Sequence, residues 1–87
     1  MIAEPATSRL TLYTRPGCHL CEDAKAIVAR VAEETGVGWS EIDISGDPEL
    51  EDEYGLRIPV LLLDGVEHGY WRVEEHRLRA DLNGDQR

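Results

Sequence analysis

The strongest constraint on the fold is a pair of cysteines placed between two segments of different apolar periodicity. Residues 10–14 alternate between two faces, are rich in strand-forming types, and end at Arg-Pro-Gly in residues 15–17. Cys18 and Cys21 follow directly, and apolar residues then recur at intervals of three and four until a glycine ends the pattern. The sequence therefore predicts a strand, a tight turn and a helix over about residues 18–35, with Cys18 at the helix N-terminus and Cys21 one turn further on.

The rest of the chain continues to alternate strands and helices. The pattern indicates strands over 39–44, 60–63 and 66–71, a short helix over 47–55 and a last helix over 73–82. We expect strands separated by helices to pair in parallel through right-handed crossovers, and Asp64-Gly65 to form a hairpin that adds an antiparallel strand. The order β-α-β-α-β-β-α predicts an α/β domain with a mixed four-stranded sheet and helices on both faces.

The length of 87 residues allows one domain, which we place at residues 9–82 with flexible termini at 1–8 and 83–87. No apolar run reaches the roughly 18 residues of a membrane span, and the N-terminus has no signal-peptide pattern. We therefore expect a cytoplasmic monomer with no membrane partner. In a reducing cytoplasm, a close cysteine pair is more often catalytic or metal-binding than a structural disulfide.

The formal net charge of -9 argues against a nucleic-acid partner, because phosphates are bound by clustered basic side chains. Acidic residues, in contrast, gather between residues 41 and 53 with no basic residue among them. This acidic segment is either a solvated surface that keeps the protein soluble or a docking surface for a basic partner.

The position of the cysteines predicts unequal chemistry for them. Cys18 at the helix N-terminus lies where unpaired backbone N–H groups and the helix dipole favour a thiolate. Cys21 lies one turn deeper and is suited to attack a mixed disulfide formed at Cys18. Between them, His19 can tune the redox potential if it stabilises the Cys18 thiolate as a cation or a hydrogen-bond donor.

Two segments carry a resemblance to a known family. Residues 12–21, Leu-Tyr-Thr-Arg-Pro-Gly-Cys-His-Leu-Cys, resemble the active-site strand and turn of glutaredoxins. Residues 54–60, Tyr-Gly-Leu-Arg-Ile-Pro-Val, look like the thioredoxin-superfamily segment that carries a cis-proline. Together with the order of elements, the resemblance covers residues 10–82, is closest to the small bacterial glutaredoxin-like branch, and implies the thioredoxin fold.

The resemblance also implies roles for individual residues. Cys18 would be the nucleophile and Cys21 the resolving thiol, with Pro59 as the cis-proline beside them. The backbone of Ile58 would pair with an extended substrate or with glutathione, and Arg15 would help to hold a glutathione carboxylate. Proline at position 59 also suits the start of a strand, because it cannot donate a hydrogen bond to the ladder.

The chain departs from typical glutaredoxins at two places. His19-Leu20 stands where Pro-Tyr is usual, and residues 72–74 stand where a Gly-Gly pair usually accommodates glutathione. The function implied is a thiol–disulfide oxidoreductase acting in cell redox homeostasis on protein or small-molecule disulfides. We expect no bound cofactor, and electrons from glutathione, another small thiol or a thioredoxin-reductase-like enzyme.

Other interpretations of the cysteine pair stay open. The cysteines can be ordinary buried residues, or ligands of a metal together with the only other soft candidates, His19, His68 and His76. One chain offers few ligands, so a zinc ion or iron–sulfur cluster would bridge two chains. A non-catalytic redox-sensing or metal-binding module is therefore the alternative function. We interpret four aromatic residues as packing residues in preference to substrate platforms: Tyr13, Trp39, Tyr70 and Trp71.

Overall fold

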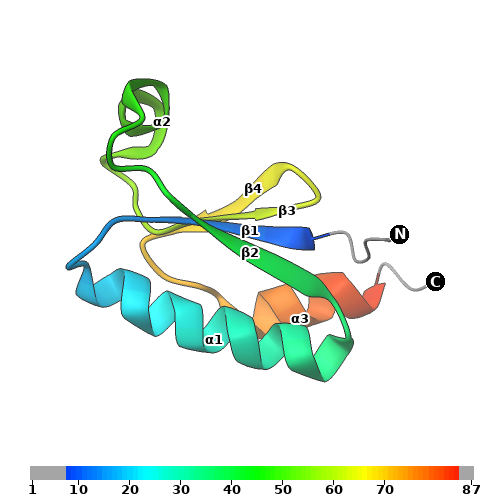
Figure 1. Cartoon of the computed structure of the whole chain (residues 1–87). Coiled ribbons are helices and arrows are strands. Elements are labelled where there is room, and N and C mark those ends of the chain that lie inside the picture. Colours follow the sequence, from blue (N-terminus) through cyan, green and yellow to red (C-terminus); the bar gives the residue numbers. More distant parts are fainter. Residues whose placement is uncertain (1–7, 85–87) are drawn as a thin grey trace, which may run out of the picture.

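The computed structural model describes residues 8–84 and has the element order that the sequence predicts (Figure 1). The elements are β1 (Ser8–Thr14), α1 (His19–Thr35), β2 (Gly38–Asp43), α2 (Pro48–Tyr54), β3 (Val60–Leu63), β4 (Val66–Tyr70) and α3 (Glu75–Gly84). Three residues expected in flexible ends lie in regular elements: Ser8 in β1, and Asn83 and Gly84 in α3. The rest of that prediction, residues 1–7 and 85–87, falls outside the described residues. Within residues 8–84, no helix has the length and apolar character needed to cross a membrane.

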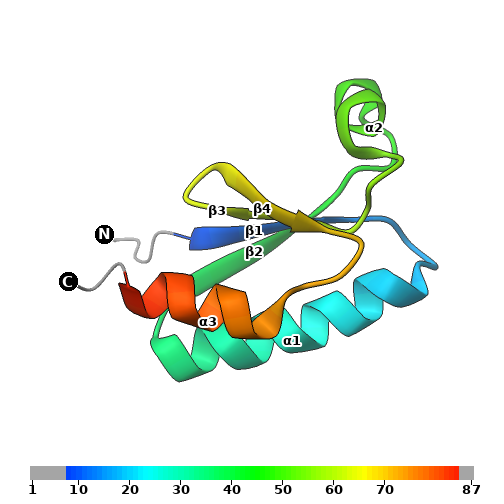
Figure 2. The same cartoon turned by 180° about the vertical axis from the view of Figure 1, so that it is seen from behind.

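The sheet is mixed, as predicted, but one of its pairings differs from the expectation. Its strand order is β2-β1-β3-β4, with β1 parallel to β2, β3 antiparallel to β1, and β4 antiparallel to β3. The prediction that helix-separated strands pair in parallel is therefore right for β2 and wrong for β3. The reason is visible in Figures 1 and 2: α2 lies beyond the strand ends and does not cross the sheet, so the chain re-enters at the same end and runs back.

The main core lies between the sheet and two helices. Figures 1 and 2 show α1 and α3 side by side under one face of the sheet, and α2 on the opposite side at its end. Apolar side chains from β1, β3, α1 and α3 fill the space between them: Leu10, Leu12, Ala24, Val28, Val31, Ala32, Leu61, Leu78 and Leu82. The second face is only partly covered, with Tyr54 of α2 stacked on Tyr13 of β1 at 4.5 Å between ring centroids.

The helix and hairpin ends follow from local sequence. Gly36 has a φ of 72°, the left-handed conformation that ends α1. The Asp47 carboxylate accepts hydrogen bonds from two backbone N–H groups in the first turn of α2. Asp64 and Gly65 have φ values of 54° and 84°, so both central residues of the β3–β4 turn have the positive φ of a tight two-residue hairpin.

An ion-pair network joins α1 to α3 along their exposed side. Arg30 of α1 lies 3.0 Å from Glu75, and Arg79 bonds both Glu75 and Glu34 at 2.8 Å. The hydrogen bonds from Arg30 and Arg79 lower the pKa of the Glu75 carboxyl to about 2. The network adds a charged contact to the apolar packing between the two helices.

Candidate active site

Cys18 is the N-cap of α1 and has an extended backbone with a φ of -100°. Its sulfur accepts a hydrogen bond from the backbone N–H of Cys21 at 3.2 Å, and its carbonyl accepts from the N–H of Glu22. The sulfur therefore occupies the position that a serine or aspartate oxygen takes in an ordinary helix cap. The free backbone N–H groups at the start of α1 and the positive end of the helix dipole point toward this sulfur.

Cys21 has a different environment from Cys18. It is 1% exposed and packs with Ile44 and Ile58, whereas Cys18 is half-buried at the edge of the same cluster. Burial and the hydrogen bond with Cys18 raise the pKa of the Cys21 thiol to about 12, against a smaller lowering by a hydrogen bond from the backbone of Arg15. Both thiols are free, so the site combines one accessible sulfur with one shielded thiol.

The segment before β3 borders the two cysteines. The Ile58–Pro59 peptide bond is cis, Pro59 is fully buried, and the Ile58 side chain packs in the cluster that holds Cys21. Among the backbone hydrogen bonds of residues 8–84, none involves the N–H or carbonyl of Ile58. These two groups can therefore bond an extended chain laid beside Cys18.

Arg15 and His19 lie on either side of Cys18 in the chain but do not converge on its sulfur. The Arg15 guanidinium reaches toward α2, 4.0 Å from the Glu51 carboxylate, and both side chains are about two-fifths exposed. His19 is exposed and forms no hydrogen bond or ion pair with another described residue. Any effect of His19 on the cysteines stays a prediction.

A small cavity of about 80 Å³ behind Cys21 is lined by polar and charged residues, some of which have no role assigned from the sequence. Its lining includes Thr14, Lys25 and Glu41. The Thr14 hydroxyl donates to the Glu41 carboxylate at 2.7 Å, and the Lys25 ammonium lies 3.6 Å from it. Glu41 pairs with Leu12 in the sheet and therefore points to the helix-covered face. Its place near Cys21 could have been predicted from the alternation of side chains along β2, but only with the β1–β2 register known.

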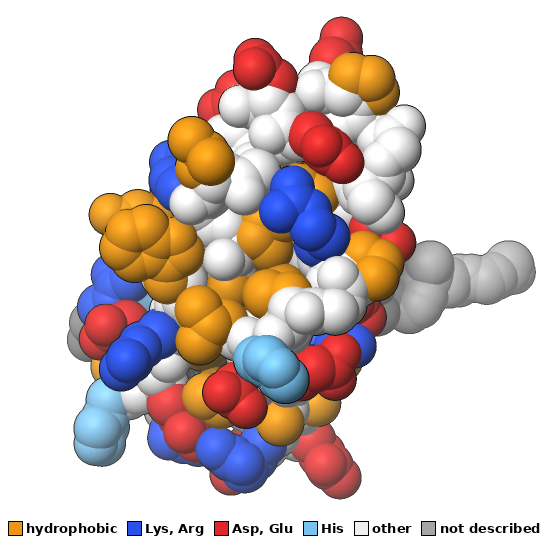
Figure 3. All heavy atoms as spheres, turned by 90° about the vertical axis from the view of Figure 1, so that its left-hand side faces the viewer, with side chains coloured by type: hydrophobic (Ala, Val, Ile, Leu, Met, Phe, Trp, Pro, Cys, Tyr) orange, Lys and Arg blue, Asp and Glu red, His pale blue; other side chains and the backbone are white. Residues whose placement is uncertain are grey.

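Trp71 also differs from the expectation, since it is not a packing residue of the core. Its side chain is 53% exposed and its indole N–H donates to the carbonyl of Leu56 at 3.2 Å. Together with Leu20 it borders a groove of about 320 Å³ between α1 and the β4–α3 connection. Figure 3 shows this end of the molecule, where apolar side chains gather in the middle and acidic side chains lie above them over α2.

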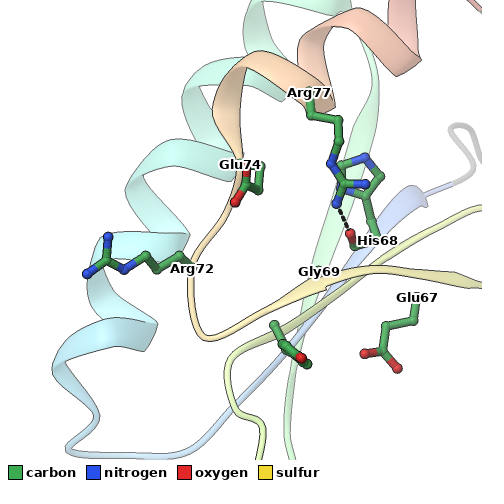
Figure 4. A pocket seen from close by; sticks show the side chains of 7 residues that line it. Glu67, His68, Gly69, Arg72, Glu74 and Arg77 are labelled. Carbon is green, nitrogen blue, oxygen red and sulfur yellow. Dashed lines mark hydrogen bonds between the residues drawn. The ribbon is translucent and has the colours of Figure 1, made fainter.

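A second hollow, of about 370 Å³, lies between β4, the β4–α3 connection and the start of α3 (Figure 4). The His68 side chain there is 7% exposed, its Nε2 lies 2.7 Å from the Asp81 carboxylate, and Arg77 donates to the His68 carbonyl. Neither cysteine lines this hollow. Across residues 8–84, no group of three or more histidine, cysteine, aspartate or glutamate side chains is arranged to hold a metal ion.

Comparisons with known proteins agree with the arrangement of these elements. Residues 9–83 match the family model described as glutaredoxin-like domain (DUF836). An uncharacterized protein of Mycobacterium tuberculosis strain H37Rv is 44% identical over 79 residues, which cover 85% of this chain and 81% of the relative. The crystal structure of protein XcR50 from X. campestris is 39% identical, with a TM-score of 0.71, over 86% of this chain and 96% of that one.

A more distant comparison identifies the fold. Thioredoxin from Fasciola hepatica superposes with a TM-score of 0.58 over 86% of this chain and 77% of its own, at 21% identity. The mixed sheet, the three helices and this likeness show that residues 8–84 adopt the thioredoxin fold.

Proposed function

The chain belongs to the glutaredoxin-like (DUF836) family, and on that premise we propose that it is a thiol–disulfide oxidoreductase in which Cys18 attacks and Cys21 resolves. The observation that carries the proposal is the unequal environment of the two sulfurs. Cys18 is partly accessible at a helix N-terminus, whereas Cys21 is buried with a raised pKa. Thiolates are the attacking form in disulfide exchange, so Cys18 is the sulfur suited to the first step.

In that first step the Cys18 thiolate attacks one sulfur of a substrate disulfide. A bond forms between Cys18 and that sulfur, the substrate S–S bond breaks, and the other sulfur leaves as a thiolate with the electron pair. The free backbone groups of Ile58 support the substrate chain during this attack, because two hydrogen bonds to an extended strand fix its position beside Cys18.

In the second step Cys21 loses its proton and attacks the Cys18 sulfur of the mixed disulfide. The negative charge of Cys18 is one cause of the high pKa of Cys21, and this cause disappears once Cys18 is bonded to substrate. Glu41, a carboxylate in the cavity behind Cys21, can take the proton. The products are a Cys18–Cys21 disulfide and the second substrate thiol, so two electrons have passed from the protein to the substrate.

The oxidised protein then needs a reductant to act again. Glutathione, another low-molecular-weight thiol or a thioredoxin-reductase-like enzyme would return the two electrons and restore both thiols. This cycle suits the cytoplasm, where dithiols are kept reduced.

A disulfide-reduction assay with matched variants tests the proposal. The reduced protein is mixed with 2-hydroxyethyl disulfide and a thiol supply, and turnover is compared for wild type, Cys18→Ser and Cys21→Ser. We expect Cys18→Ser to lose all turnover above the uncatalysed exchange and Cys21→Ser to retain exchange at Cys18. Equal turnover by wild type and Cys18→Ser would refute the assignment of the nucleophile.

The rival function is a non-catalytic redox sensor or a metal- or cluster-binding module on the same fold. Since residues 8–84 of one chain bring no set of three potential ligands together, such a module would take ligands from a second copy. Metal analysis of the protein purified without chelators distinguishes the two. A protein that carries stoichiometric zinc or iron and fails to reduce any disulfide would favour the rival.

A further inference from the structure

The groove between α1 and the β4–α3 connection is lined mainly by apolar side chains. It is bordered by Leu20 and Ile27 from α1 and by Trp71 and Val73 from the β4–α3 connection. Leu20 is 43% exposed and Trp71 53% exposed, so both present apolar surface to solvent at the rim. Leu20 is the second residue of α1, which Cys18 caps, so this wall lies at the same end of the helix as the Cys18 sulfur. The Trp71 wall is bonded to the carbonyl of Pro59, and the neighbouring Ile58 packs in the cluster that holds Cys21.

Trp71 is held firmly on one wall of this groove. Its backbone N–H donates to the carbonyl of Pro59 at 2.8 Å, its indole N–H donates to Leu56, and its ring lies against that of Tyr70 with 5.1 Å between centroids. Its φ of 65° is one that glycine adopts more readily than a bulky residue. A large aromatic ring fixed at such a position, between the cis-proline segment and the groove, is suited to contact a bound chain.

On the α2 side of Cys18, away from the groove, the charged side chains are mostly negative. Three carboxylates of α2, those of Glu49, Asp52 and Glu53, form no ion pair with another described residue. All three belong to α2, and Figure 3 shows acidic side chains above the apolar middle of this end of the molecule. Within the groove itself one carboxylate, Asp23, is balanced by one guanidinium, Arg72.

We propose that the groove between Leu20 and Trp71 selects protein disulfides in which an apolar side chain adjoins the half-cystine and basic side chains follow it. The apolar side chain enters the groove, and the basic side chains lie toward the carboxylates of α2. Glutathione has no apolar side chain and carries a net negative charge, so it is the poorer substrate. This inference rests on the proposed function, since it names the substrate class of the same site.

Peptides that release a coloured thiolate test the selection in a single turnover. Each peptide carries 2-nitro-5-thiobenzoate on its cysteine as a mixed disulfide. Cys18 attacks the peptide sulfur, the Cys18–peptide disulfide forms, and nitrothiobenzoate leaves with the electron pair because it is the more acidic thiol. The rate of colour release from the reduced full-length protein is compared for Leu-Cys-Leu-Lys-Lys, Gly-Cys-Gly-Lys-Lys, Leu-Cys-Leu-Glu-Glu and the glutathione derivative.

We expect Leu-Cys-Leu-Lys-Lys to react about tenfold faster than Gly-Cys-Gly-Lys-Lys, which is within the range for a side chain entering an apolar pocket. Leu-Cys-Leu-Lys-Lys should react about threefold faster than Leu-Cys-Leu-Glu-Glu at low salt. This difference in rate should shrink at high salt because the charges are exposed. The glutathione derivative should react more slowly than the leucine-lysine peptide.

Variants of the two residues at the rim of the groove test whether the groove causes the preference for leucine over glycine. Trp71→Ala and Leu20→Ala should each bring the leucine-to-glycine rate ratio close to one, while Trp71→Phe should keep most of it because the ring remains. Val66→Ala, at the exposed β3–β4 turn, is the matched control and should keep the full ratio. A general change in Cys18 reactivity divides out of this ratio, and Leu20→Ala keeps the test valid if Trp71→Ala does not fold.

The outcome of the peptide assay separates selection by the groove from the oxidoreductase function itself. A full leucine preference that survives both Trp71→Ala and Leu20→Ala, or no preference in the wild type, would overturn the selection by the groove and leave the oxidoreductase function intact. No colour release from any of the four probes would instead contradict the proposed function itself.

Discussion

At the scale of single residues, the chemistry depends on the difference between two sulfurs three positions apart. The helix begins after Cys18, so Cys18 lies at its cap and Cys21 lies one turn inside, against Ile44 and Ile58. The same spacing with the helix beginning elsewhere would expose both sulfurs or bury both. The proposed function therefore depends on where the helix starts as much as on the cysteine motif.

Alkylation should distinguish the two cysteines in the folded protein. Because burial and the hydrogen bond with Cys18 raise the pKa of Cys21 from 9.0 to about 12, Cys21 has far less thiolate at pH 8 than an ordinary thiol. We expect iodoacetamide at pH 8 to modify Cys18 and leave Cys21 unmodified, as measured by mass spectrometry of the digested protein. In urea both cysteines should react, and equal labelling of the two in the folded state would contradict the account.

At the scale of elements, α3 packs against α1 and the sheet through the apolar core, and the ion-pair network also joins it to α1. Leu78 is fully buried in the cluster between α1, α3 and the sheet. Leu78→Ala should lower the free energy of unfolding by about 2–5 kcal/mol, because it leaves a cavity in this packing. Urea denaturation measures the change, and Val66→Ala, 69% exposed, should change it by no more than about 0.5 kcal/mol.

The ion pairs of Glu75 make the contact between α1 and α3 sensitive to acid. Its pKa in the folded state is lowered from 4.5 to about 2, so its contribution to stability is present above pH 4.5 and is lost as the pH falls toward 2. We expect Glu75→Gln to lower stability at neutral pH and to show a smaller further loss between pH 4.5 and 2, by thermal melts at each pH. Glu74→Gln, which removes a carboxylate with no ion pair among the described residues, should follow the wild-type pH dependence.

The order of elements could be predicted from sequence because each element carries its own local pattern. The cap at Asp47, the hairpin at Asp64-Gly65 and the periodic apolar residues of α1 all act within a few residues. The direction of β3 could not be predicted in this way, since it depends on α2 lying at the end of the sheet. Nothing within the seven residues of α2 distinguishes a crossover helix from one that only turns the chain.

At the scale of the whole molecule, the candidate site is only partly predictable. Cys18, Cys21 and Pro59 are recognisable because they lie in motifs. Glu41 and Trp71 reach the site only through the β1–β2 register and the return of the chain after β4, which are long-range features. An exposed tryptophan beside a groove and a buried one in a core have the same local sequence pattern, so the assignment of Trp71 to packing was wrong.

The mass of the protein in solution distinguishes one chain from a bridged pair. We expect a monomer of 9.8 kDa in light scattering after size exclusion, both with and without a chelator. A species of twice that mass that carries metal and dissociates with a chelator would support the rival module, in which two copies share a metal ion or cluster.

The central claim, that the two cysteines have unequal and sequential roles, is tested most directly by intact-mass spectrometry after reaction with one equivalent of a peptide disulfide. We expect Cys21→Ser to accumulate a lasting mixed disulfide on Cys18. Wild type should end as the Cys18–Cys21 disulfide with no peptide attached, and Cys18→Ser should stay unmodified. A mixed disulfide on Cys21 in Cys18→Ser, at a rate similar to that of Cys18 in Cys21→Ser, would contradict this claim.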